Sequence, residues 1–212
     1  MTLAIPLLIV GALLGLVADF VSRRWPQHEE DYVPSSGIRW QTLVLVATGA
    51  AVFAVLPLRW VEPRDQLILA VYCAALLVLL ATDLDQKLLP DLITLPLIVF
   101  SGAVLLLGWS PVLAGKELGL VSGVAAGIGL PILLFVSDRI LHGELGGGDL
   151  KLAVSIGLMS GVAALVFGLL VASIGFSVVL IALMVMRRLS LKSAVPFGPV
   201  LILGAFAAVL LA

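Results

Sequence analysis

Cysteine and charge are both scarce in this sequence. Cys73 is the only cysteine among 212 residues, and it stands inside an apolar run. A single cysteine cannot form an internal disulfide or a thiolate zinc site, so we expect it to be a small, buried apolar side chain. Charged residues make up 12% of the chain and the formal net charge is −1, which gives no electrostatic basis for binding nucleic acid.

The chain is rich in apolar residues. They make up 62% of the chain, and the mean hydropathy is +1.25. A soluble domain has about half apolar and a quarter charged residues. The apolar runs show no strict alternation with polar residues, which favours helices over the strands of a membrane barrel. The composition therefore predicts an all-α integral membrane protein, a polytopic helical bundle surrounded by lipid.

The apolar segments predict six to eight transmembrane helices in a single domain that covers residues 1–212. The sixth segment is too short for a comfortable span and can merge with the seventh, because only Gly157, Ser160 and Gly161 mark a break between them. The longest polar segment, 21–40, is too short to be a domain of its own. The eight candidate segments are 3–20, 41–57, 67–82, 92–108, 119–137, 150–162, 163–186 and 198–212.

The distribution of lysine and arginine predicts the orientation. With the N-terminus outside, nine of these residues fall in inside loops and three in outside loops, which supports an even number of spans with both termini outside. The same orientation puts Asp83 and Asp149 at the cytoplasmic face. The inside set is Arg23, Arg24, Arg39, Lys87, Arg139, Lys151, Arg187, Arg188 and Lys192, and the outside set is Arg59, Arg64 and Lys116.

Asp83 ends the third apolar segment, in LLATDLDQKLLPD. An ionisable side chain at the edge of the hydrocarbon costs about 3 kcal/mol on insertion scales, and its default interpretation is a functional one. Asp85 and Lys87 follow in the loop, where we expect them to be solvated or to pair locally. Asp91 follows Pro90 and suits the N-cap of the next helix, which is a structural explanation for that residue.

Asp149 stands at the start of the sixth segment, after Gly146, Gly147 and Gly148. Glycine permits positive φ and close approach of the backbone, so this run predicts a sharp turn with room beside the carboxylate. A helix N-terminus favours a carboxylate and a helix C-terminus disfavours one, so Asp149 and Asp83 have contrasting environments. Such a contrast suits an acid/base pair. The alternative is an ordinary capped helix start after a glycine turn.

Other polar residues have weaker claims to a role. Lys151 could orient the Asp149 carboxylate or hold a substrate group, or it could anchor its helix at the membrane interface. His142 and Glu144 lie in the same loop but are not needed for a mechanism with two carboxylates. Asp19 is spaced for an i,i+4 ion pair with Arg23.

Three motifs together resemble the type IV prepilin leader peptidases, and the resemblance covers nearly the whole chain. Asp83 to Leu97 has the pattern D-x-x-x-x-x-L-P-D-x-x-T-L-P-L. Gly146 to Leu152 contains G-x-G-D followed by x-K-L, and Ala194 to Pro199 contains P-F-G-P. G-x-G-D alone is a weak signal that also occurs in presenilin-type proteases, whereas the three motifs in this order are specific.

The resemblance implies that Asp83 and Asp149 are catalytic, with Gly146, Gly147, Gly148, Lys151 and Asp91 as supporting residues. It implies an intramembrane aspartic peptidase without a metal or other cofactor. The expected substrates are prepilin or pseudopilin precursors of type IV pili and type II secretion, cut on the cytoplasmic side of the plasma (inner) membrane after a short basic leader.

The chain departs from the resemblance at one place. Many members carry two C-x-x-C pairs that bind zinc in the loop after the first span, whereas segment 21–40 contains no cysteine. The sequence therefore favours the relatives that only cleave over those that also N-methylate the product. A small proton-coupled transporter or channel, or a scaffold for pilus assembly, stays open as an alternative. The oligomeric state also stays open.

Overall fold

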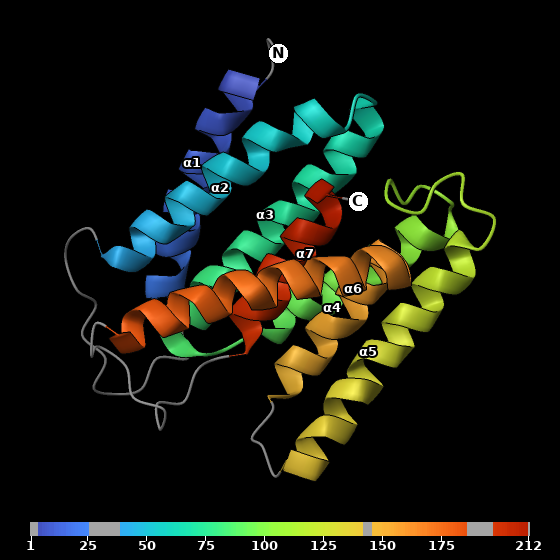
Figure 1. The fold of residues 1–212 in the computed structure, drawn as a ribbon. Coiled ribbons are helices and arrows are strands. Elements are labelled where there is room, and N and C mark those ends of the chain that lie inside the picture. Colours follow the sequence, from blue (N-terminus) through green and yellow to red (C-terminus); the bar gives the residue numbers. More distant parts are fainter. Residues whose placement is uncertain (1–3, 26–38, 142–145, 186–196, 212) are drawn as a thin grey trace.

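The computed structural model describes residues 4–25, 39–141, 146–185 and 197–211 of the chain. Helices account for most of these residues and no strand occurs among them, which confirms the all-α prediction. The helices of the described part, shown in Figure 1, are α1 (Ala4–Arg23), α2 (Trp40–Arg59), α3 (Pro63–Gln86), α4 (Asp91–Leu106), α5 (Gly119–Leu141), α6 (Gly147–Val185) and α7 (Gly198–Leu211).

Five of these helices are long and apolar enough to cross a membrane, namely α1, α2, α3, α5 and α6. The apolar helices α4 and α7 are shorter. The result is the polytopic helical bundle that the composition predicted. Figure 1 shows α1 and α2 side by side at one side of the molecule and α5 at the other, with α3 and α7 between them.

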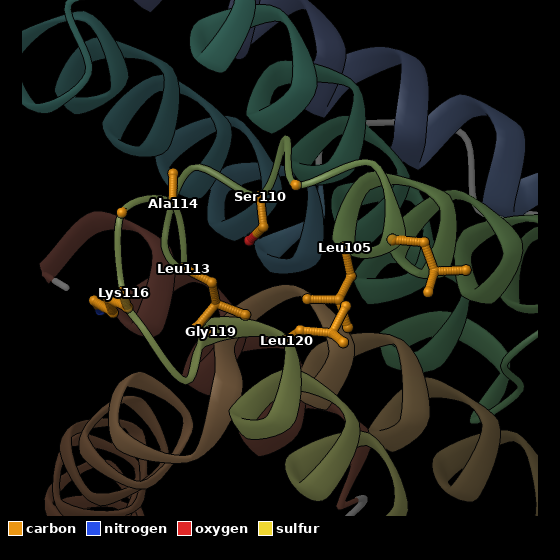
Figure 2. A pocket seen from close by; sticks show the side chains of 10 residues that line it. Leu105, Ser110, Leu113, Ala114, Lys116, Gly119 and Leu120 are labelled. Atoms are coloured by element: carbon orange, nitrogen blue, oxygen red, sulfur yellow. The ribbon is translucent and has the colours of Figure 1, made fainter.

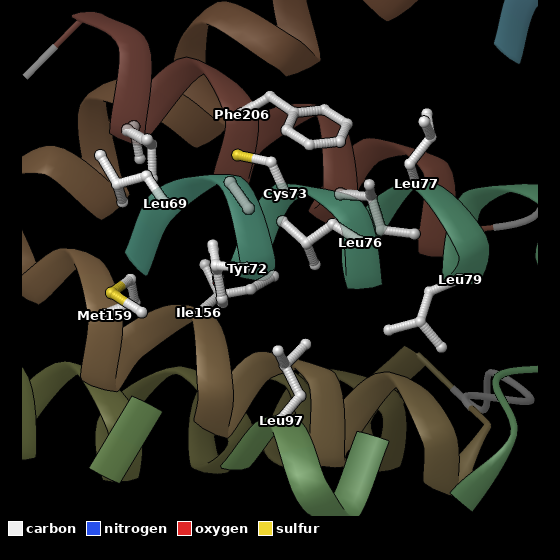
Figure 3. Packing of buried hydrophobic residues seen from close by; sticks show 14 of the residues in the cluster. Leu69, Tyr72, Cys73, Leu76, Leu77, Leu79, Leu97, Ile156, Met159 and Phe206 are labelled. Atoms are coloured by element: carbon white, nitrogen blue, oxygen red, sulfur yellow. The ribbon is translucent and has the colours of Figure 1, made fainter. Parts of the chain in front are cut away.

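Helix α3 forms the centre of the bundle and is the most deeply buried of the five long helices. Its residues Tyr72, Cys73 and Leu76 are fully buried. Figure 3 shows this face of α3 against Ile156 of α6 and Phe206 of α7. Because lipid is as apolar as leucine, such helices associate through close packing and hydrogen bonds rather than through release of water. The buried Cys73 agrees with its expected role as a small apolar side chain.

Small residues let neighbouring helices approach closely. A Cβ built on Gly11 of α1 would collide with the backbone oxygen of Gly49 in α2. A Cβ on Gly168 of α6 would collide in the same way with the backbone oxygen of Gly204 in α7. Glycine at these positions brings the backbones within contact distance, which is a common device between membrane helices.

Helix α6 breaks at Gly161, where φ is 68° and ψ is 177°. The predicted segments 150–162 and 163–186 thus form one element with two limbs, and Figure 1 shows the change of direction between them. A break inside a membrane leaves backbone groups that need new partners. Ser110 Oγ donates to the Met159 carbonyl at 3.1 Å, and the Val162 N–H donates to Ser122 Oγ at 2.9 Å.

Candidate active site

Asp83 lies in the last turn of α3 and is only 5% exposed. The helix ends one turn later at Lys87, which adopts the left-handed conformation (φ 55°) and donates its N–H to the Asp83 carbonyl at 2.9 Å. A left-handed residue at this position is a common way to end a helix. The carboxyl group therefore stands at a helix end, as the sequence predicted, but it is turned into the protein rather than toward solvent.

Asp149 lies in the first turn of α6 and is half-buried. Its backbone N–H donates to the Gly146 carbonyl at 3.1 Å, which starts the helix. The Asp83 and Asp149 side chains are near enough for their charges to interact. Two carboxyl groups that are 66 positions apart in the sequence thus lie within range of an electrostatic interaction, one where α3 ends and the other where α6 begins.

The three glycines before Asp149 have different surroundings. A Cβ on Gly148 would lie 2.7 Å from Leu89 Cβ, so the first turn of α6 can pack on the α3–α4 connection only without a side chain there. A Cβ on Gly147 would meet nothing within 4 Å, and one on Gly146 would lie 3.6 Å from Asp149 Oδ2, an ordinary contact. Of the three glycines, only Gly148 is therefore needed for the close approach of α6 to Leu89.

The residues that lead into the predicted sharp turn, 142–145, lie outside the described part, so the turn stays a prediction, but the three glycines do not use positive φ. The described glycines with positive φ are Gly108, Gly115 and Gly161, and none of them precedes Asp149. The chain enters α6 with φ values that any residue can adopt, because the helix already begins at Gly147.

Gly198, the first residue of α7, completes the surroundings of Asp83. A Cβ on Gly198 would stand 2.6 Å from Asp83 Oδ2 and 3.0 Å from Oδ1, so any side chain there would occupy the place of the carboxyl. Among the described residues, Asp83 Oδ2 has no hydrogen-bond partner although it is buried. The sequence marked P-F-G-P as a motif of the resemblance but assigned no role to Gly198, so this contact with Asp83 was missed.

Lys151 and Asp91 pair with each other rather than with the two candidate carboxyls. Lys151 Nζ lies 2.6 Å from Asp91 Oδ1, which links the N-terminal ends of α6 and α4. Asp91 is the first residue of α4 and Pro90 occupies the N-cap, so the predicted cap role of Asp91 is wrong by one position. The ion pair tethers the turn that carries Asp149.

Three further ion pairs lie on the α1 and α2 side of this site, and together they link Asp19, Arg23, Arg39 and Asp85. Asp19 Oδ2 and Arg23 Nη2 are 2.6 Å apart, which confirms the expected i,i+4 pair. For Asp85 the sequence predicted either solvation or a local pair, and solvation is wrong because the side chain is only 3% exposed. It binds Arg39 at the start of α2, with 2.6 Å between Oδ1 and Nη1.

Some predicted positions lie outside the described residues, including His142, Glu144 and most of segment 21–40. Within the described ranges, no three His, Cys, Asp or Glu side chains come together in a way that could hold a metal ion. The expected absence of a metal stays a prediction.

A cavity of about 210 Å³ lies at the other end of the bundle, between the end of α4 and the start of α5. Figure 2 shows Leu105, Ser110 and Leu113 on its wall, with Lys116 at its edge. The whole of α4 separates this cavity from Asp91 and from the two carboxyls. It is therefore distinct from the candidate active site.

The fold and site define a multi-pass membrane protein with two carboxyl groups that interact electrostatically at one end of a helical bundle. Residues 70–184, more than half of the chain, match the model of the type IV leader peptidase family, and both Asp83 and Asp149 fall inside the match. The chain belongs to this family.

Curated relatives point the same way. A prepilin leader peptidase/N-methyltransferase of Bacillus subtilis is 32% identical over 166 residues, which cover 76% of this chain and 62% of that protein. The protein of the same description from Dickeya chrysanthemi is 32% identical over 165 residues, with 76% and 56% covered. The protein of the same description from Burkholderia pseudomallei is 33% identical over 132 residues, which cover 62% of this chain and 42% of that protein. The chain thus spans about half the length of the relatives it matches, and no solved structure matches it significantly.

Proposed function

We propose that this protein is an aspartic endopeptidase that removes the short basic leader from type IV prepilin or pseudopilin precursors. The observation that carries the proposal is the approach of Asp83 and Asp149 at one end of the bundle, in a chain that belongs to the leader peptidase family. The positive-inside bias supports a site that faces the cytoplasm from the plasma membrane.

The proposed mechanism uses one carboxylate and one carboxylic acid. One aspartate takes a proton from water as the water attacks the scissile carbonyl, and the other, protonated, donates a hydrogen bond to the developing oxyanion. A charge on one carboxyl disfavours a charge on its neighbour, which suits a pair with one carboxylate and one carboxylic acid. The buried Asp83 Oδ2, which has no partner among the described residues, is available for the water or the carbonyl.

The proposal covers cleavage and leaves N-methylation aside. The relatives named above carry both activities in their description, but segment 21–40 has no cysteine for the zinc loop that the resemblance associates with bifunctional members. A cleavage-only enzyme is the simpler hypothesis for this chain.

The test is a cleavage assay with purified protein in detergent and a prepilin precursor, read by gel shift and by mass of the new N-terminus. We expect the parent to cut after the glycine that ends the leader. Asp83→Asn and Asp149→Asn should each reduce the rate by at least about 10²–10⁴-fold, since each removes one proton-transfer group. A chelator should leave cleavage unchanged.

Asp65→Asn is the matched control, because it makes the same change at the opposite end of α3. It should retain the parent rate. Full cleavage by both Asp83→Asn and Asp149→Asn would refute the two-aspartate mechanism. No cleavage by a folded parent, together with a proton flux in liposomes that is lost in Asp149→Asn, would instead favour the transporter hypothesis.

A further inference from the structure

The three residues directly after Asp83 are each tied to α1 or α2. The Leu84 carbonyl accepts a 2.6 Å hydrogen bond from Gln41 Nε2 of α2. Asp85 binds Arg39 at 2.6 Å. Gln86 Nε2 donates to the Ser22 carbonyl of α1 at 2.9 Å.

Arg39 is the centre of this arrangement because it bridges two carboxylates. Its Nη1 lies 2.6 Å from Asp85 Oδ1 of α3, and its Nη2 lies 3.3 Å from Asp19 Oδ1 of α1. The Asp19 Oδ2 atom also accepts from Arg23 at 2.6 Å and from Thr42 Oγ1 at 2.9 Å. A planar guanidinium with five donors can hold two carboxylates in fixed geometry, which a lysine cannot do.

Such a buried ionic group is a poor source of stability. The cost of taking the charges out of water roughly cancels their attraction, and apolar residues of similar volume often stabilise as well or better. Buried ionic groups can instead specify one conformation. Here the specified element is the last turn of α3, which carries Asp83 on the side that meets α7 and Asp85 on the side that meets α1 and α2.

We propose that Arg39 and Asp85 are positioning residues of the peptidase. Their ion pair fixes the last turn of α3 and thereby holds the Asp83 carboxyl in the position in which it acts together with the Asp149 carboxyl. The inference rests on the proposed function. Neither residue needs to touch the substrate. A displacement of about 1 Å at a reacting group can cost roughly 10²-fold in rate, so a loosened turn would lower kcat while leaving KM nearly unchanged.

The test compares Asp85→Asn and Arg39→Lys with the parent in the prepilin cleavage assay, with kcat, KM and thermal unfolding measured on each. Both changes keep a polar group in place, and Arg39→Lys also keeps the charge. We expect kcat to fall by about 10–100-fold and KM to stay within about twofold. The double variant should be no slower than the slower single variant, because both changes break one connection.

The matched control is the ion pair at the opposite end of α3, where Arg64 Nε lies 3.3 Å from Asp65 Oδ1. Arg64→Lys and Asp65→Asn make the same substitutions on the same helix and should leave kcat unchanged. Parent-like kcat in both Asp85→Asn and Arg39→Lys would overturn the inference. So would a loss of activity that only follows the loss of folded protein.

Gln41→Met decides the matter if the charged variants fail to fold. It breaks the hydrogen bond to the Leu84 carbonyl without leaving a charge unpaired, and it should lower kcat without a change in KM. An unchanged kcat in this variant would show that loosening the last turn of α3 does not slow cleavage. That result would refute the positioning role of Arg39 and Asp85. A folded parent that cuts no precursor would refute the proposed function, whereas a cutting parent with unaffected variants would refute this inference alone.

Discussion

Gly198 lies directly against the carboxyl group of Asp83, so that a Cβ at position 198 would stand 2.6 Å from Asp83 Oδ2. The start of α7 therefore forms one wall around this carboxyl. We expect Gly198→Ala to push the Asp83 side chain aside and to lower kcat by about 10²-fold or more, because a misplaced reacting group is costly in rate. Cleavage kinetics on the purified variant would measure this.

Overpacking at this site should cost about 1–3 kcal/mol of unfolding free energy, so folding must be checked separately. Gly129→Ala is the control, because a Cβ at that position of α5 meets nothing within 4 Å. It should fold and cleave like the parent. Equal activity in Gly198→Ala and Gly129→Ala would mean that the Asp83 carboxyl does not work in the position described.

The glycine run before Asp149 offers a second matched pair. Gly148→Ala would place its methyl group 2.7 Å from Leu89 Cβ, whereas Gly147→Ala would meet nothing within 4 Å. We expect Gly148→Ala to displace the first turn of α6 and to abolish most cleavage, while Gly147→Ala keeps it. The cleavage rates of the two alanine variants, measured in the same assay, test this. A larger loss of cleavage in Gly147→Ala than in Gly148→Ala would contradict the geometry.

The Lys151–Asp91 ion pair should support activity only modestly. Its side chains are 37% and 60% exposed, and exposed pairs contribute about 0–1 kcal/mol. We expect Lys151→Gln and Asp91→Asn each to lower the cleavage rate by less than about tenfold, with no further loss in the double variant. A loss in Lys151→Gln as large as that of Asp149→Asn would show that the ammonium acts on the substrate directly.

Packing of α1 on α2 gives a prediction for stability. Gly11→Ala would drive its methyl group into the Gly49 backbone, so the two helices must separate. We expect a loss of about 1–3 kcal/mol in unfolding free energy. Thermal unfolding in detergent measures it against Gly175→Ala, whose Cβ meets nothing within 4 Å. Equal unfolding temperatures would indicate that α1 is not packed as described.

The sequence was informative wherever a local pattern decides the structure. Long apolar runs predict the helices, and the positions of Asp83 and Asp149 at the ends of two runs predict that both carboxyls reach the same end of the bundle. The Asp19–Arg23 pair follows from its i,i+4 spacing alone. These features depend on short stretches of chain and need no knowledge of how the helices pack.

Features that depend on packing between distant segments could not be predicted. Asp85 was expected to be solvated or to pair locally, but it binds Arg39, which lies 46 positions earlier in the sequence. The need for glycine at position 198 follows from a carboxyl on α3, which lies more than a hundred positions earlier in the sequence. Gly147 and Gly148 are neighbours in one glycine run, and the sequence alone does not show that only Gly148 faces Leu89.

The break at Gly161 has a consequence for how deep the protein sits in its bilayer. At a rise of 1.5 Å per residue, the limb from Gly147 to Ser160 is about 20 Å long, shorter than the roughly 30 Å of a hydrocarbon core. A segment this short cannot take its vertical position from matching its own apolar length to the membrane. Ser110 and Ser122 bind the backbone on either side of the break, and so they fix the C-terminal end of this limb relative to the rest of the protein. In a thicker or thinner bilayer the outer helices can change their tilt, while the height of Asp149 stays tied to its neighbours in the protein.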